Sequence, residues 1–182
     1  ALHEFSSRYK GQDFMVFGFT FIIWQYLVRH ILDSGKSLDF SRGVLIHGGG
    51  WKKSIEHAVD NRKFKSTLSQ SLGIDRVHNY YGMVEQTGSI YLECEFGYLH
   101  SSVLSDVAVL DSSFNELDFL ESGMLKLTSL IPTSYPGNII LTEDLGRIVG
   151  EDSCLCGRLG KYFEVEGRIP EADTRGCSDT RE

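Results

Sequence analysis

The sequence predicts an α/β fold, in which a parallel-sheet core of alternating strands and helices precedes a small, mostly antiparallel β subdomain. Short apolar runs at 16–19, 43–46 and 77–81 alternate with helix-like segments at 20–32 and 54–72. This alternation is typical of a parallel sheet with helices packed against it. Five further short strands then follow, separated by turn residues, which is typical of antiparallel β structure; they are expected at 90–94, 107–110, 124–128, 138–141 and 163–166.

Local signals justify the elements of the core in chain order. The apolar strand at 16–19 leads to Thr20, which we expect to cap a helix whose apolar residues recur at helical spacing. Asp33-Ser34-Gly35-Lys36 ends that helix, and Gly43–Ile46 is short and wholly apolar, like a central parallel strand. A polar helix over 54–72 then leads into the third strand.

Length and composition are sufficient for such a fold, because the 182 residues are 41% hydrophobic and can form a sizeable core. We divide the chain into a partial α/β core (1–102), a β subdomain (103–170), and a hinge with a polar tail (171–182). The carboxyl-terminal residues are polar and charged, and we expect them to be loosely packed.

The charge excludes one class of partner. The net charge is −7, with 25 acidic against 18 basic residues, and no basic patch is visible, so we predict no nucleic-acid partner. The most apolar run, 14–28, includes several polar residues, so we predict no membrane span. Ala1-Leu2-His3-Glu4 has no basic-then-apolar leader, which predicts a cytoplasmic protein with reduced cysteines.

Two loops at the ends of predicted parallel strands have ligand-binding signals. Gly48-Gly49-Gly50 can free backbone amides to contact a nucleotide, although a tight turn is the alternative. The next strand ends in Tyr81-Gly82-Met83-Val84-Glu85, where the ring can stack on a planar ligand. Gly82 lets backbone approach the ligand, and Glu85 can hold Mg²⁺ beside phosphates. Packing and surface roles are the alternative for these residues.

Two later strand ends add polar groups suited to a nucleotide. Asp144, in Thr142-Glu143-Asp144-Leu145-Gly146-Arg147, can accept hydrogen bonds from ribose hydroxyls; an exposed ion pair in a turn is the alternative. Arg168, after Gly167, can bind a phosphate or ribose through its fixed set of donors, or it is a surface arginine.

Four of these motifs together resemble the core signatures of the adenylate-forming ligases: GGG at 48–50, YGMVE at 81–85, TEDLGRI at 142–148 and EGRIPEADTRG at 166–176. CLCGR at 154–158 resembles the phenylacetate–CoA ligase branch. The combination of HGGGWKK, YGMVEQTG and RGCSD is more similar to the acyl-protein synthetase (LuxE-type) branch. The resemblance extends from about residue 16 to residue 179.

The resemblance implies ATP-dependent, Mg²⁺-dependent activation of a fatty or similar carboxylic acid as an acyl-adenylate. It implies that the glycines at 48–50 contact adenine and phosphate, and that Tyr81 flanks the adenine. Glu85 would hold magnesium, Asp144 the ribose hydroxyls, and Arg168 would touch the nucleotide at the hinge. Cys177 would then accept the acyl group as a thioester, and an acyl-accepting reductase would be the partner.

The sequence departs from the family pattern in ways that leave alternatives open. Val84 stands where threonine is common, Pro170 stands where an acidic residue usually follows Gly-Arg, and no Ser/Thr/Gly-rich phosphate loop precedes the motifs. We interpret the chain as the carboxyl-terminal part of a longer ligase. A coenzyme A ligase of the phenylacetate type, in which Cys177 is idle, is one alternative. A non-catalytic ligand-binding fragment, oligomeric through exposed apolar surface, is another.

A second set of residues predicts a metal site. Cys154 and Cys156 are one residue apart, and Cys94 and His100 lie on an earlier predicted hairpin. Three thiolates and an imidazole are ligands that zinc prefers, so we predict a structural Zn²⁺ that joins parts of the β region and takes no part in the chemistry. Packing of reduced thiols in a core is the alternative.

Overall fold

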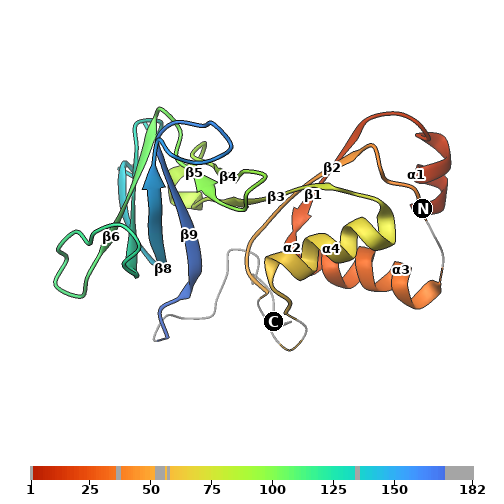
Figure 1. Ribbon diagram of the computed structural model, residues 1–182, viewed down its shortest axis with the longest axis horizontal. Coiled ribbons are helices and arrows are strands. Elements are labelled where there is room, and N and C mark those ends of the chain that lie inside the picture. The colour runs from red at the N-terminus through yellow and green to blue at the C-terminus, as the bar shows by residue number, and fades with distance from the viewer. Residues whose placement is uncertain (1, 36–37, 52–55, 57, 134–135, 171–182) are drawn as a thin grey trace. The chain divides into compact units, whose positions relative to one another are not determined.

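The computed structural model describes residues 2–170 except 36–37, 52–55, 57 and 134–135, and the chain forms two compact units, Ala1–Asn79 and Tyr80–Glu182 (Figure 1). Residues 80–102, which the sequence-based division groups with the α/β core, lie in the second unit. That division, with its boundaries at 102 and 170, stays a prediction.

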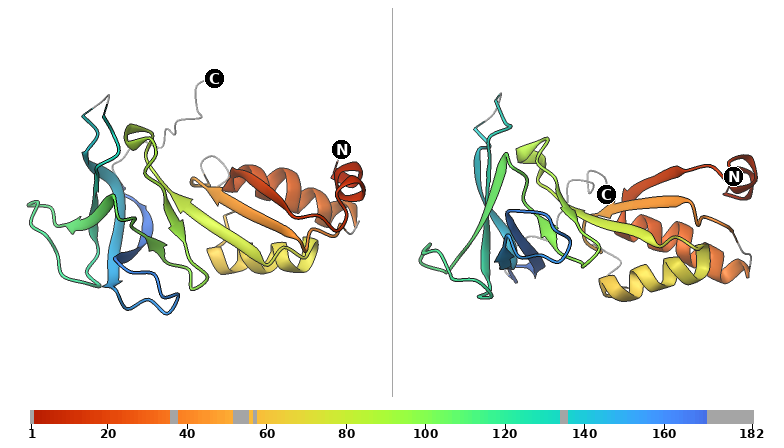
Figure 2. Two further views of the ribbon diagram at one scale, coloured as in Figure 1. Left: turned by 90° about the horizontal axis from the view of Figure 1, so that it is seen from above. Right: turned by 45° about the horizontal axis from the view of Figure 1, so that its top comes forward.

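The first unit has the expected α/β character. β1 (Phe14–Phe19) pairs in parallel with β2 (Gly43–Gly48), and β3 (Arg76–Tyr81) follows β2 in the strand order. Helices precede and flank these strands (Figure 2). They are α1 (Leu2–Arg8), a helical span made of α2 (Thr20–Ile22), the π-helical η1 (Ile23–Val28) and α3 (Arg29–Ser34), and then α4 (Asn61–Leu72).

Capping sets the ends of α4 and corrects one predicted boundary. Asp60 accepts a 2.7 Å hydrogen bond from the backbone N–H of Lys63, so α4 begins at Asn61 and not at residue 54. Residues 58–60 are not helical, whereas residues 54, 55 and 57 lie outside the described residues. Gly73 ends α4 in the left-handed conformation, with φ +71°, as glycine commonly does after a helix.

The predicted capping role of Thr20 is wrong. Phe19 occupies the position before the helix and makes no side-chain cap. The hydroxyl of Thr20 instead donates to the carbonyl oxygen of Gly48 over 3.1 Å and lies 2.9 Å from Nδ1 of His47. Thr20 therefore connects the helical span to the end of β2, the strand that leads into the glycine triplet.

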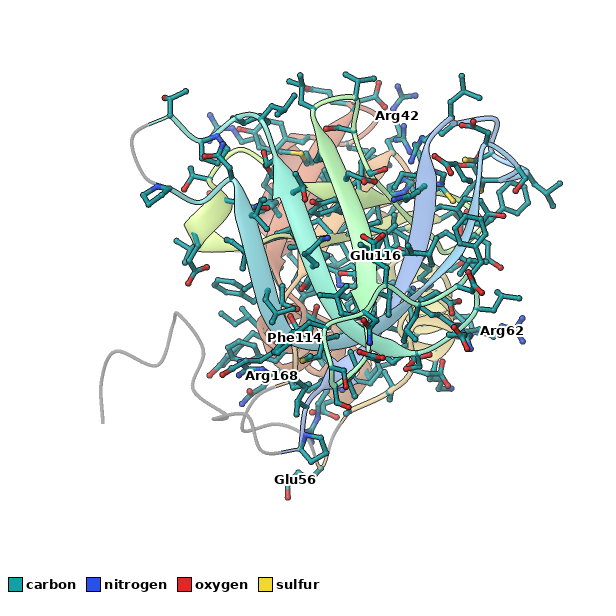
Figure 3. The ribbon with its side chains drawn as sticks, turned by 90° about the vertical axis from the view of Figure 1, so that its left-hand side faces the viewer. Arg42, Glu56, Arg62, Phe114, Glu116 and Arg168 are labelled. Carbon is teal, nitrogen blue, oxygen red and sulfur yellow. The ribbon has the colours of Figure 1, made fainter. Side chains whose placement is uncertain are left out.

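The second unit is an antiparallel sheet, as predicted, in the order β4-β5-β9-β8-β7-β6. Tyr80 and Tyr81, the last residues of β3, pair antiparallel with Leu92 and Tyr91 of β4. Figure 3 looks onto these strands. Their bounds are β4 (Tyr91–Glu93), β5 (Leu99–His100), β6 (Ser105–Leu110), β7 (Gly123–Ser129), β8 (Ile139–Glu151) and β9 (Lys161–Arg168).

β8 corrects a second expectation, because Asp144 lies inside this strand and not at its end. The polar TEDLGR sequence looks like a turn, but all of its residues lie inside the long strand β8. Gly146 is required there, since a Cβ atom at this position would lie 2.3 Å from the carbonyl oxygen of Glu164. A bulge between Leu145 and Gly146 accompanies this close approach of β8 and β9.

Each unit has its own apolar core. In the first unit Phe64, Leu68 and Leu72 of α4 pack with Leu45 of β2 and Ile74. In the second unit the buried residues come from most of the strands and include Tyr91, Leu99, Val107, Val109, Leu125, Leu127, Ile148 and Phe163. No helix in the described part of the chain has both the length and the apolar character needed to cross a bilayer.

Candidate functional site

Three predicted site residues meet at one place in the second unit. The hydroxyl of Tyr81 donates a 2.7 Å hydrogen bond to Oδ2 of Asp144. Asp144 lies opposite Arg168 in the β8–β9 register, and Nε of Arg168 is 3.7 Å from Oδ1 of Asp144. Arg168 also pairs with Glu143. Arg168 is the last residue of β9 and is labelled near the lower end of the strands in Figure 3.

The geometry leaves Asp144 well oriented and still reachable. Its backbone N–H donates to the hydroxyl of Thr142 over 3.1 Å, and that hydroxyl donates to the carbonyl oxygen of Leu125 over 3.0 Å. The Asp144 side chain is 18% exposed. A carboxylate has about four lone-pair positions, so the bond from Tyr81 leaves acceptor capacity for hydroxyl donors of a ligand.

Tyr81 is held as a hydrogen-bond donor. Its ring lies 6.2 Å from the rings of both Tyr91 and Phe163. Burial, followed by the negative charge of Asp144, raises the pKa of Tyr81 far above its usual range. The phenol therefore stays protonated at neutral pH and continues to donate to Asp144.

Glu85 lies on a separate turn of the same unit. It is exposed, and it lies in the 3₁₀ turn η3 (Val84–Gln86). The next residue, Gln86, is 1% exposed, and its Nε2 donates to the carbonyl oxygens of Leu127 (3.1 Å) and Asn138 (3.3 Å). Gln86 therefore anchors the turn to β7, which fixes the position from which the Glu85 carboxylate projects.

The glycine triplet lies in the first unit, at the end of β2. Gly48 is buried, whereas Gly49 and Gly50 are exposed. Gly49 has φ +75°, a conformation that favours glycine, and a Cβ atom on Gly50 would meet nothing within 4 Å. This segment therefore presents open backbone, which is what the predicted contact with a nucleotide requires.

The four predicted metal ligands also come together in the second unit. Cys94 follows β4, His100 ends β5, and Cys154 and Cys156 lie in the loop between β8 and β9. Their ligand atoms all lie within 4.8 Å of one another. Cys94 and Cys154 are free thiols with their sulfur atoms 3.9 Å apart, and Sγ of Cys156 is 3.4 Å from Nε2 of His100.

The structure thus brings Tyr81, Asp144 and Arg168 together, and it separately brings the three cysteines and His100 together. Gly82 follows Tyr81 directly, and a Cβ atom there would lie 3.0 Å from the carbonyl oxygen of Ser89. Cys177, the predicted nucleophile, lies outside the described residues. Sequence reasoning missed Gln86 and Thr142 as positioning residues. The available signal was position alone: Gln86 directly follows Glu85, and Thr142 precedes Asp144 by two residues.

Comparison with known proteins gives concordant results. A family model described as "Acyl-protein synthetase, LuxE" matches residues 2–182. The long-chain-fatty-acid–luciferin-component ligase of Aliivibrio fischeri is 24% identical over 185 residues, covering 97% of this chain and 47% of that protein. The protein of the same name from Vibrio harveyi is 20% identical over 175 residues, covering 94% and 45%. The chain therefore spans about half the length of these relatives.

Solved structures show the same fold. An open conformation of 2-hydroxyisobutyryl-CoA ligase, in complex with 2-HIB-AMP and CoA, matches 93% of this chain and 36% of that chain, with a TM-score of 0.70 and 17% identity. A long-chain-fatty-acid–CoA ligase (FadD1) from Archaeoglobus fulgidus matches 92% and 36%, with a TM-score of 0.60 and 17% identity. The fold is that of a fragment of an adenylate-forming ligase.

Proposed function

Because the chain belongs to the acyl-protein synthetase (LuxE) family, we propose that it provides part of the active site of an ATP-dependent ligase that activates a fatty acid. The activated acyl group is then transferred to the thiol of Cys177 as a thioester. The acyl group finally passes to a partner enzyme, for which a reductase is the expected class. A cytoplasmic location is part of the same proposal.

The chemistry has two balanced steps. A carboxylate oxygen of the acid attacks the α-phosphorus of ATP, which forms the acyl-adenylate and releases pyrophosphate. The sulfur of Cys177, having given its proton to solvent or a nearby base, then attacks the acyl carbonyl carbon. The carbon–oxygen bond to AMP breaks, AMP leaves, and the thioester remains on the protein.

The observation that supports this function most is the contact of Tyr81 with Asp144 beside Arg168. In the proposed role, Asp144 accepts hydrogen bonds from the ribose hydroxyls and the ring of Tyr81 flanks the adenine. The guanidinium of Arg168 contributes positive charge and donors beside the nucleotide. Tyr81 then has two roles, because its hydroxyl also fixes the carboxylate that binds the sugar.

The remaining predicted residues have roles in the same proposal. Glu85 is an exposed carboxylate on an anchored turn, and oxygen ligands of this kind suit Mg²⁺, which would offset the negative charge of the phosphates. The open backbone at Gly48, Gly49 and Gly50 would contact adenine and phosphate, and Gly82 would let the chain approach the ligand closely.

Radiolabelled fatty acid tests the proposal. A longer protein that contains this sequence (the parent) and this chain would each be incubated with labelled acid, ATP and Mg²⁺, separated on a denaturing gel, and treated with hydroxylamine. We expect a hydroxylamine-labile label on the protein, because thioesters react with hydroxylamine. Cys177→Ser should abolish this label and still form acyl-adenylate, and Ser178→Ala serves as a control because it changes the neighbouring residue and keeps every thiol.

Other outcomes would support the alternatives. Adenylate without labelled protein, followed by acyl transfer to added coenzyme A, would identify a coenzyme A ligase in which Cys177 is idle. Absence of adenylate from both proteins with every acid tried would contradict the ligase function and leave a ligand-binding fragment. A label on the parent alone would show that this chain needs the rest of the protein.

A further inference from the structure

The cluster of Cys94, His100, Cys154 and Cys156 lies apart from the residues used for the proposed function, and it has its own chemistry. Three thiols and one imidazole converge from two separate parts of the second unit, with all ligand atoms within 4.8 Å of one another. We propose that this cluster binds a structural Zn²⁺ ion through the three sulfur atoms and Nε2 of His100. This proposal does not rest on the ligase function.

Distances within the cluster fit a tetrahedral zinc ion. With Zn–S bonds of about 2.3 Å and Zn–N bonds of about 2.0–2.1 Å, tetrahedral angles place two sulfur ligands about 3.8 Å apart and a sulfur and a nitrogen about 3.6 Å apart. The corresponding distances are 3.9 Å between Cys94 and Cys154 and 3.4 Å between Cys156 and His100. A disulfide needs sulfur atoms about 2.05 Å apart.

The backbone around Cys154 and Cys156 makes a tight turn. Gly157 makes this turn possible with φ +77°, and its own N–H donates to the carbonyl oxygen of Cys154 over 3.0 Å. The turn therefore lets the sulfur atoms of Cys154 and Cys156 both reach the cluster.

The leucines of the loop at 152–160 contribute little apolar burial, and the buried part of the loop is the cysteine that packs with Cys94 and Tyr162. The two leucines, Leu155 and Leu159, are 83% and 75% exposed, whereas Cys154 is buried. The loop lies beside the β4–β5 hairpin that provides Cys94 and His100 (Figures 1 and 2). A zinc ion would join the loop to the hairpin with four strong bonds, in addition to the limited apolar burial of this loop.

Packing of reduced thiols alone accounts less well for His100. Its side chain is 6% exposed, and its Nε2 faces the sulfur of Cys156, which is a weak hydrogen-bonding partner. Burial of an imidazole without a strong partner is unfavourable. Coordination to zinc would satisfy Nε2, and the ring would remain stacked on Tyr162, at 5.6 Å and an interplanar angle of 22°.

Metal analysis of the purified protein tests this proposal. After dialysis against metal-free buffer, we expect one zinc ion per chain by inductively coupled plasma mass spectrometry. Replacement of the zinc by Co²⁺ should give the visible absorption bands and thiolate charge-transfer bands of a tetrahedral cobalt site. Cys156→Ser removes one of the proposed zinc ligands. Changes to residues outside the ligand set lower metal affinity roughly 10- to 100-fold, and we expect Cys156→Ser to lower zinc affinity by more than this.

Cys177→Ser is the matched control, because it removes the one cysteine outside the cluster, and it should keep one zinc ion per chain. Fewer than about 0.1 zinc ions per wild-type chain, together with no tetrahedral cobalt spectrum, would overturn the proposal. Full zinc affinity in Cys156→Ser, or loss of zinc in Cys177→Ser alone, would also overturn it. If Cys156→Ser does not fold, the wild-type cobalt spectrum decides the question.

Discussion

Replacement of Tyr81 by phenylalanine tests the link between the aromatic residue and the carboxylate. The change removes one hydroxyl and keeps the ring against Tyr91 and Phe163. The lost bond is a 2.7 Å donation to Asp144, and hydrogen bonds to charged groups contribute about 1.5–3 kcal/mol. Because the Asp144 side chain is 18% exposed, water replaces part of this, so we expect Tyr81→Phe to lower the free energy of unfolding by about 1–2 kcal/mol.

A double-mutant cycle isolates this pair from other effects. Urea unfolding would be measured for the wild type, Tyr81→Phe, Asp144→Ala and the double variant. We expect a coupling energy of about 1–2 kcal/mol, because either single change removes the same bond. Tyr26→Phe is the control: Tyr26 is 65% exposed, and its change should shift the free energy of unfolding by less than about 0.5 kcal/mol.

The same four proteins should differ in ATP binding in a related way. If the Tyr81 hydroxyl positions the Asp144 carboxylate to bind the ribose, Tyr81→Phe should weaken ATP binding in the wild-type background. The same change should have little effect on ATP binding in the Asp144→Ala background. A coupling energy in unfolding below about 0.3 kcal/mol would refute the reasoning, since independent groups give additive effects.

Three further predictions follow from named contacts. Burial and the charge of Asp144 raise the pKa of Tyr81 above its ordinary value of 10.0, so above pH 10 it is mainly the unfolded chain that loses this proton. The free energy of unfolding of the wild type, measured by urea titration, should therefore fall with rising pH by about 1.4 kcal/mol per pH unit more than that of Tyr81→Phe. Gln86→Leu removes two donated hydrogen bonds in a buried site, so we expect urea unfolding to show a loss of about 1–3 kcal/mol and steady-state kinetics a higher Mg²⁺ requirement. Gly146→Ala should lower the melting temperature by several degrees because its Cβ would clash with the backbone of Glu164, whereas Gly50→Ala, in open space, should leave it unchanged and weaken ATP binding if that backbone contacts the nucleotide.

The fold class was predictable because it depends on local patterns. Wholly apolar runs separated by helical segments predicted the parallel pair β1 and β2, and short runs between turns predicted the antiparallel sheet. His100 was placed on a hairpin with Cys94, but β5 was not among the predicted strands, because two residues have no periodicity. The start of α4 was misplaced because the polar residues before Asp60 resemble a helix in composition, and only the capping hydrogen bond fixes the boundary.

The candidate site was predictable as residues but not as a network. Tyr81, Asp144 and Arg168 each stood in a motif, yet 63 residues separate Tyr81 from Asp144, and only strand pairing brings them together. Gln86 was missed for a related reason: its amide is buried because carbonyl oxygens of Leu127 and Asn138 need a donor, and nothing near Gln86 in the sequence indicates those partners.

The register of β8 against β9 could not be predicted from the TEDLGR motif. TEDLGR was predicted to lie at the end of a strand, but Gly146 lies inside β8, where the backbone of Glu164 leaves no room for a Cβ atom. The bulge beside it shifts the register, and the result is that Asp144 lies opposite Arg168. A shift of one residue would turn Asp144 to the other face of the sheet, away from Tyr81. The proposed nucleotide contacts of Asp144 therefore depend on a glycine that need not touch the nucleotide.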